Sequence, residues 1–126
     1  MATILLVDND PLQAYLCKSV LEGRFADVQR VAYAAEALCL VEQPQFAANL
    51  GLVISGQPMP GIGGPAFVAE LHSRMPWVPV LVLGEAGEGA ENYEEYGACF
   101  RTRPVGSKEL LKLTGQMLAE GKRAMA

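Results

Sequence analysis

The hydrophobic residues of this chain gather into short runs that recur at regular intervals. Several runs are almost continuously apolar, whereas a strand with one solvated face alternates apolar and polar positions. Strands of a parallel sheet that helices cover on both faces show this near-continuous pattern. The runs that we predict as strands are residues 3–7, 28–31, 52–55, 78–83 and 98–102.

Segments of helical length separate these runs. The first opens with Asp10, which we predict as the N-cap, and has Pro11 at its first helical position. Apolar residues then follow at the spacing of one helix face. We predict a second helix over residues 34–41, which Pro44 stops. The apolar residues that mark a third helix are Phe67, Val68 and Leu71.

Two further helices are predicted towards the end of the chain. The one over residues 88–96 has few apolar anchors, because glycines flank its start and its main candidates are Tyr93 and Tyr96. The last helix begins at Ser107, which we predict as its N-cap, and we expect it to fray near Gly121. Strand and helix therefore alternate five times.

This alternation predicts an α/β fold, a doubly wound five-stranded parallel sheet with helices on both faces. A length of 126 residues, of which 51% are hydrophobic, suits a single domain over residues 1–126. Ligands of such sheets bind at the carboxyl ends of the strands, where the chain order reverses. We therefore expect the functional residues at that edge.

Charge and composition narrow the choice of function. Ten Lys and Arg against fourteen Asp and Glu give a net charge of -4, so direct binding of nucleic acid is not expected. No stretch approaches the roughly 20 apolar residues of a membrane helix, and the first residues lack a secretory signal. The odd cysteine set matches neither a zinc motif nor a disulfide framework, which favours the cytoplasm. The cysteines are Cys17, Cys39 and Cys99.

Four segments at the predicted strand ends form a recognisable pattern. They are ILLVDNDP at the first strand, LVISGQPMPGIGG at the third, VPVLVLGEAGEG at the fourth and YGACFRTRPV at the fifth. The Met-Pro-Gly turn at residues 59–61, Gly64 and the Arg103–Pro104 pair add to it. In these features the chain resembles the response-regulator receiver domains of bacterial two-component signalling over nearly its whole length. The resemblance implies a flavodoxin-like topology with strand order 2-1-3-4-5.

The same resemblance implies where the signalling chemistry lies. In that family, two acidic residues after the first strand and an aspartate ending the third hold magnesium, and that aspartate accepts the phosphoryl group. A hydroxyl residue ending the fourth strand and a lysine ending the fifth contact the phosphoryl group. The resemblance places these five positions at Asp8, Asn9, Gly56, Gly84 and Arg103. Four of the five differ from the family pattern.

These differences predict a site that does not accept a phosphoryl group. Gly56 has no side chain to act as a nucleophile, and Ser55 does not replace it because neighbouring strand residues point to opposite faces. With Asp8 as the one remaining carboxylate, we expect no specific magnesium site, no other metal and no cofactor. We expect the Arg103 guanidinium to turn towards Asp8, since a partly buried charge without a partner is costly. The family pattern also implies a cis bond between Arg103 and Pro104.

Charge is unevenly distributed over the last third of the chain. Five glutamates crowd the predicted fourth helix and the segment just before it, and six of the ten basic residues follow in the last quarter. The resemblance implies that the fourth helix, fifth strand and fifth helix form a docking face, and we predict a two-fold dimer there. An ordinary solvated face is the alternative. The charged residues that we assign to this face are Glu91, Glu94, Glu95, Arg101, Lys108 and Lys112. The apolar candidates are Tyr93, Tyr96 and the outward-facing members of Leu110, Leu113 and Met117.

We therefore predict a receiver domain that works without phosphorylation, through protein contacts and not as an enzyme. An orthodox phosphorylated receiver is the first alternative, and it requires a carboxylate near Gly56. A small flavodoxin-like enzyme is the second. It requires a phosphate-binding loop after the first strand or a nucleophile on a sharp strand-to-helix turn, and the VDNDP segment offers neither.

Overall fold

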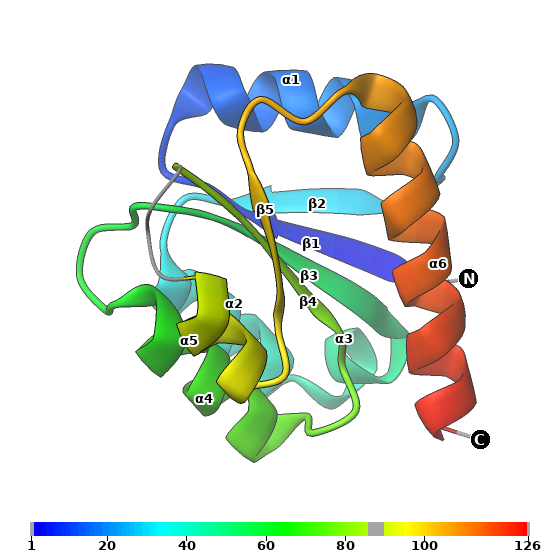
Figure 1. The fold of residues 1–126 in the computed structure, drawn as a ribbon. Helices are drawn as coiled ribbons and strands as arrows, with labels where there is room; N and C mark the ends of the chain where they lie inside the picture. The colour runs from blue at the N-terminus through cyan, green and yellow to red at the C-terminus, as the bar shows by residue number, and fades with distance from the viewer. Residues whose placement is uncertain (1, 86–89, 126) are drawn as a thin grey trace.

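Five parallel strands form one sheet in the computed structural model, which describes residues 2–85 and 90–125 (Figure 1). The spatial order is β2-β1-β3-β4-β5, and every neighbouring pair is parallel. The predicted fold class and strand order are confirmed. The strands are β1 (Thr3–Val7), β2 (Val28–Val31), β3 (Leu50–Gly56), β4 (Val80–Gly84) and β5 (Cys99–Thr102).

Helices cover both faces of the sheet. Helices α1 and α6 lie on one face, and α2, α4 and α5 lie on the other (Figure 1). Along β1, Ile4 and Leu6 join the apolar cluster of α1 and α6, whereas Leu5 and Val7 join the opposite cluster. Burial of both faces explains the near-continuous apolar runs. The helices are α1 (Pro11–Glu22), α2 (Ala34–Val41), α3 (Pro44–Asn49), α4 (Gly64–Arg74), α5 (Ala90–Glu95) and α6 (Ser107–Met125).

The strand bounds agree with the prediction for β1 and β2 and differ at the other three. Strand β3 begins two residues earlier, and both it and β4 end one residue later. Strand β4 begins at Val80 because the Val78 amide bonds the Met75 carbonyl at 3.1 Å and Pro79 has no amide hydrogen. Strand β5 begins one residue late because the Ala98 amide bonds the Tyr93 carbonyl at 2.9 Å.

The helix prediction needs two corrections. Pro44 follows the end of α2, but it also opens the short helix α3 at its first turn, a position that proline tolerates. Gly121 does not end the last helix, because α6 continues to Met125. A Cβ at Gly121 would lie 2.8 Å from Pro79 Cδ, so glycine there allows α6 to approach the sheet closely.

Two other helix predictions have different outcomes. The Asp10 N-cap is confirmed, since its carboxylate accepts hydrogen bonds from the amides of Leu12 and Gln13 at 3.0 and 3.3 Å. The predicted helix over residues 88–96 corresponds to α5. Its predicted start and Glu88 lie outside the described residues.

Candidate functional site at the carboxyl edge of the sheet

The strand register brings the predicted site positions together. Val7 of β1 pairs with Ser55 of β3, Gly56 pairs with Leu83 of β4, and Gly84 pairs with Thr102 of β5. Asp8 and Asn9 follow β1, Gly56 and Gly84 end their strands, and Arg103 follows β5. All five positions therefore lie at one edge of the sheet.

Asp8 is almost fully buried at this edge, with 7% of its surface exposed. Its Oδ1 accepts a hydrogen bond from the Asp10 amide at 2.9 Å, and Arg30 donates to its backbone carbonyl. Burial raises the pKa of Asp8 above its ordinary value of 3.8, while the Asp10 amide and the nearby Arg103 act in the opposite direction. The carboxylate is thus held in place, but in an environment that disfavours its charge.

Arg103 turns back into the site. Its Nη2 lies 3.5 Å from Asp8 Oδ2, and its Nη1 donates a 2.8 Å hydrogen bond to the Gln57 carbonyl. A longer contact of 3.9 Å joins Nη1 to Glu85 Oε1 at the rim. The predicted approach of Arg103 to Asp8 is confirmed. The predicted cis bond between Arg103 and Pro104 is also present, and the bond between Gln57 and Pro58 is cis as well, which the sequence did not indicate.

Gly56 provides the space that this ion pair fills. A Cβ built on Gly56 would lie 2.6 Å from both Arg103 Nη2 and Asp8 Oδ2. Any side chain at position 56 must therefore displace the guanidinium, the carboxylate or both. The Arg103–Asp8 pair in its present position therefore requires glycine at position 56.

The residues present do not fit the magnesium ion of the family. Asp8 uses one oxygen for the Asp10 amide and turns the other towards Arg103, and neither Asn9 nor Gly56 adds a carboxylate. The positively charged guanidinium also lies where a cation would have to approach Asp8. Over residues 2–85 and 90–125, no three acidic, histidine or cysteine side chains lie close enough to hold a metal.

Ser55 lies on the opposite face of β3, as strand alternation requires. Its hydroxyl is fully buried and accepts a 3.1 Å hydrogen bond from Gln57 Nε2. On this face Tyr93 of α5 stacks on Phe100 of β5, with ring centroids 5.5 Å apart, and its hydroxyl reaches the backbone of Gly64. Sequence reasoning did not single out Gln57 or the contact between Tyr93 and Gly64. Gly64, which opens the third predicted helix, was the one signal in the sequence for this contact.

The predicted charged face is exposed where the structure describes it. Glu94, Glu95, Arg101, Lys108 and Lys112 are all exposed, and nothing is described of the Glu91 side chain. Most of the apolar candidates for this face are not available. Tyr96 is 45% exposed, whereas the buried candidates are Tyr93, Leu110 and Met117. The expectation that Tyr93 contributes contact area is therefore wrong, because it packs inward on Phe100.

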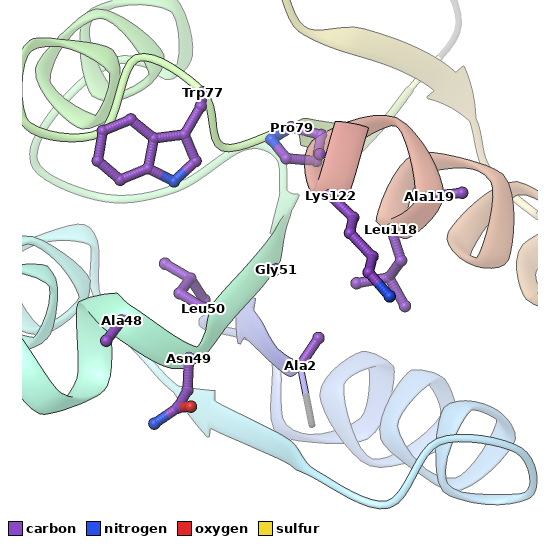
Figure 2. A pocket seen from close by; sticks show the side chains of 11 residues that line it. Ala2, Ala48, Asn49, Leu50, Gly51, Trp77, Pro79, Leu118, Ala119 and Lys122 are labelled. Carbon is purple, nitrogen blue, oxygen red and sulfur yellow. The ribbon is translucent and has the colours of Figure 1, made fainter. Parts of the chain in front are cut away.

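A well-formed hollow lies at the opposite, amino edge of the sheet (Figure 2). It has a volume of about 420 Å³, and Trp77, Pro79 and Leu118 form much of its wall. Its polar groups include Asn49 and Lys122 (Figure 2). Open α/β sheets place their chemistry at the carboxyl edge, so this hollow is remote from the site positions.

Fold and site together define a flavodoxin-like α/β domain whose polar residues converge beyond the carboxyl ends of β1, β3 and β5. The chain belongs to the response regulator receiver domain family, whose model matches residues 4–112. Members of this family are generally non-enzymatic modules of two-component signalling that act through protein contacts. No curated protein sequence matches the chain.

Solved structures of receiver domains are similar over almost the whole chain. A response regulator receiver domain protein from Clostridium thermocellum is 21% identical, with a TM-score of 0.88 and 98% of each chain covered. A CheY-like receiver domain protein from Methanospirillum hungatei JF-1 is 22% identical, with a TM-score of 0.86 and 98% of each chain covered. A putative response regulator from Chloroflexus aurantiacus J-10-fl is 26% identical, with a TM-score of 0.83, and covers 94% of this chain and 98% of its own.

None of the helices in the described part of the chain is long and apolar enough to span a membrane.

Proposed function

We propose that this chain is a phosphorylation-independent receiver domain that acts as a protein interaction module in cytoplasmic two-component signalling. We treat residues 1–126 as one receiver unit without enzymatic activity, a cofactor or direct contact with nucleic acid. The observation that carries the proposal is the Arg103–Asp8 pair, which occupies the space beside Gly56. This internal ion pair lies at the position where the family carries a reversibly bound phosphoryl group.

The chemistry of the site supports this proposal in three steps. Acyl-phosphate formation needs a carboxylate nucleophile, and Gly56 has none. Ser55 is buried on the other face and hydrogen-bonded to Gln57. Gly84 has no hydroxyl to contact a phosphoryl group at the end of β4. The nucleophile and the hydroxyl of the family's switch are therefore both missing.

The enzyme alternative has less support. The turn after β1 is held by the Asp10 N-cap and does not form a glycine-rich phosphate loop. The hollow in Figure 2 lies at the edge remote from the site positions and is mainly apolar. The exposed charges of α5, β5 and α6 support a protein partner at that face. We expect either a two-fold dimer of this chain or a different docked protein there.

The test is amide NMR of the protein with magnesium and either acetyl phosphate or beryllofluoride. We expect no saturable shifts at the ends of β1, β3 and β4, because the nucleophile and the ion ligands are missing. A receiver that keeps the aspartate at the end of its third strand serves as the positive control under identical conditions. Saturable shifts clustered at these strand ends, beyond those from magnesium alone, would support the orthodox alternative.

A further inference from the structure

The imidazole ring of His72 joins three segments of the chain. Its Nδ1 lies 3.0 Å from the carbonyl oxygen of Tyr96, which directly follows α5. Its Nε2 lies 2.9 Å from the carbonyl oxygen of Val78, in the segment that leads into β4. His72 itself belongs to the last turn of α4, and α4 packs beside α5 (Figure 1). Both ring nitrogens therefore face a hydrogen-bond acceptor.

Two carbonyl acceptors fit one protonation state of the ring. A carbonyl oxygen has no proton to donate, so a ring nitrogen bonds it only through an N–H group. A neutral imidazole has one N–H group, and its other nitrogen would turn a lone pair towards a carbonyl oxygen. The imidazolium has two N–H groups and can donate to both carbonyls. The two contacts of His72 therefore fit the doubly protonated ring.

The Tyr96 carbonyl belongs to the turn that ends α5. Gly97 continues this turn with a φ of 79°, and its amide donates a 3.0 Å hydrogen bond to the Glu94 carbonyl. The His72 ring lies against the same turn, because a Cβ on Gly97 would be 3.6 Å from His72 Cε1. Carbonyls at the end of a helix lack a partner within the helix. His72 supplies a donor for this one.

The charged side chains around His72 are mainly acidic. Glu120 of α6 lines the same hollow of about 310 Å³ as His72 and Tyr96. Glu94 and Glu95 directly precede Tyr96 on α5, and both are exposed. No lysine or arginine is among the described residues that line this hollow. The surroundings therefore favour a positive charge on the ring.

Two basic residues lie on neighbouring segments but contact other groups. The Arg74 guanidinium binds Glu42 at 3.2 Å and Glu70 at 2.8 Å. Lys122 lines the hollow at the amino edge of the sheet (Figure 2). Neither residue lines the hollow of His72.

We propose that His72 is a proton-dependent clamp that holds the end of α5 against α4. The doubly protonated ring bonds both carbonyls. On loss of a proton the ring keeps its Nε2–H, because the Val78 carbonyl is the more buried acceptor and is costlier to leave without a donor. The Nδ1 lone pair then repels the Tyr96 carbonyl, and the end of α5 is held less tightly.

The clamp makes one part of the charged face sensitive to acidity. Tyr96, Glu94 and Glu95 are exposed at the end of α5, so a change in this turn alters the surface that they present. The proposal does not rest on phosphorylation independence. The failure of either one leaves the other standing, because His72 lies away from the carboxyl edge of the sheet and the two tests use different measurements.

NMR titration of the wild type tests the clamp. His72 is the one histidine of the sequence, so its ring signals have no overlap with those of another histidine. Imidazoles exchange their proton between about pH 5 and about pH 8. At the acid end we expect a proton on both ring nitrogens, and at the alkaline end a proton on Nε2 alone. The carbonyl carbon of Tyr96 should shift with the same midpoint as the ring, and that of Val78 should shift less.

Hydrogen exchange provides a second measurement. The Gly97 amide belongs to the same peptide group as the Tyr96 carbonyl, so it reports on the clamp directly. Its protection factor should fall by about threefold to about tenfold from the acid to the alkaline end. The Phe67 amide, which bonds the Gly63 carbonyl in the first turn of α4, serves as the reference and should keep its protection.

Two variants assign the transition to its residue. His72→Gln keeps a side-chain N–H donor but does not titrate, so the Tyr96 carbonyl shift and the loss of Gly97 protection should both disappear. Glu120→Gln removes the carboxylate that shares the hollow and should keep both effects.

Four results would overturn the proposal. They are a Tyr96 carbonyl that does not follow the ring, a neutral ring protonated on Nδ1, a transition that persists in His72→Gln, and a transition that Glu120→Gln abolishes. The first two come from the wild type alone, so the proposal is still tested if a variant does not fold.

Discussion

Replacing Arg103 by methionine isolates the role of the buried ion pair. The Arg103 side chain is 17% exposed and that of Asp8 is 9% exposed, so water screens little of the contact between them. Methionine keeps most of the length and apolar character of the arginine stem. The substitution therefore leaves the Asp8 carboxylate buried without a cation beside it.

The size of the effect follows from the geometry. At 3.5 Å and an effective dielectric of about 20, the attraction between the two charges is about 5 kcal/mol before desolvation is counted. The pKa of Asp8 is nevertheless raised, so the cost of burying its charge outweighs the stabilisation of that charge by Arg103 and the Asp10 amide. The intact pair should therefore contribute little net stability, whereas removing Arg103 alone should cost about 3 kcal/mol.

A double-mutant cycle with Asp8→Asn separates these contributions. Asparagine removes the buried charge but can still accept the Asp10 amide hydrogen bond. We expect Arg103→Met with Asp8→Asn to lie within about 1 kcal/mol of the wild type. The coupling free energy is then at least about 2 kcal/mol, and it is larger by whatever Asp8→Asn alone costs. Urea unfolding followed by circular dichroism measures each free energy, and Arg103→Met alone should lower Tm by about 10 °C.

Arg101→Met is the matched control, because Arg101 is exposed on β5 and its hydrogen bonds stay within its own strand. Its cost should stay within about 0.5 kcal/mol. The reasoning is refuted if Arg103→Met costs no more than this control. It is equally refuted if the double variant loses the sum of the two single losses, since the two charges would then be independent.

Three further predictions concern titration, thiol chemistry and packing. Because burial raises the pKa of Asp8 above 3.8, its contribution to the free energy of unfolding is fully present below that pH and is lost as pH rises through the folded pKa. Urea unfolding from about pH 3 to about pH 7 should show this loss in the wild type relative to Asp8→Asn, and parallel profiles would contradict it. Burial raises the pKa of Cys17 to about 11, so iodoacetamide should alkylate the exposed Cys39 well before Cys17, and equal rates by mass spectrometry would count against this. Gly64→Ala should cost about 2 kcal/mol, because a Cβ would overlap the Tyr93 hydroxyl, and Tyr93→Phe in that background should recover part of the loss. Unfolding of Gly64→Ala at the wild-type urea midpoint would refute the overlap.

The apolar runs predicted the existence of all five strands and their sequence along the chain. They could do so because strands buried on both faces are almost continuously apolar. The first and last residues of the strands depended on backbone hydrogen bonds, which the hydrophobic pattern does not reveal. Val78 is apolar and buried, yet its amide bonds Met75 and so cannot join the sheet. The same limit applies to α3, whose six residues are too short to show a helical period and begin with a proline that resembles a stop.

The site could be predicted in part for a different reason. The approach of Arg103 to Asp8 could be predicted because the family resemblance places both residues at the same sheet edge, where a buried carboxylate without a cationic partner is costly. The hydrogen bond from Arg103 to the Gln57 carbonyl could not be predicted, because it depends on how the loop after β3 turns. The direction of Tyr93 also depends on packing. Its stacking on Phe100 turns it inward and removes it from the predicted dimer face.

Two of the differences at the site, Gly56 and Arg103, share the same space. An aspartate at position 56 would bring its Cβ to 2.6 Å from Arg103 Nη2 and Asp8 Oδ2, so the guanidinium would have to leave. Two carboxylates would then face each other without the cation that now lies beside Asp8, and each would disfavour ionisation of the other. A phosphoryl group added there would still meet no hydroxyl at Gly84. Restoring the aspartate alone would therefore disrupt the present packing without restoring a complete phosphorylation site. This is the result expected if Gly56 and Arg103 are adapted to each other.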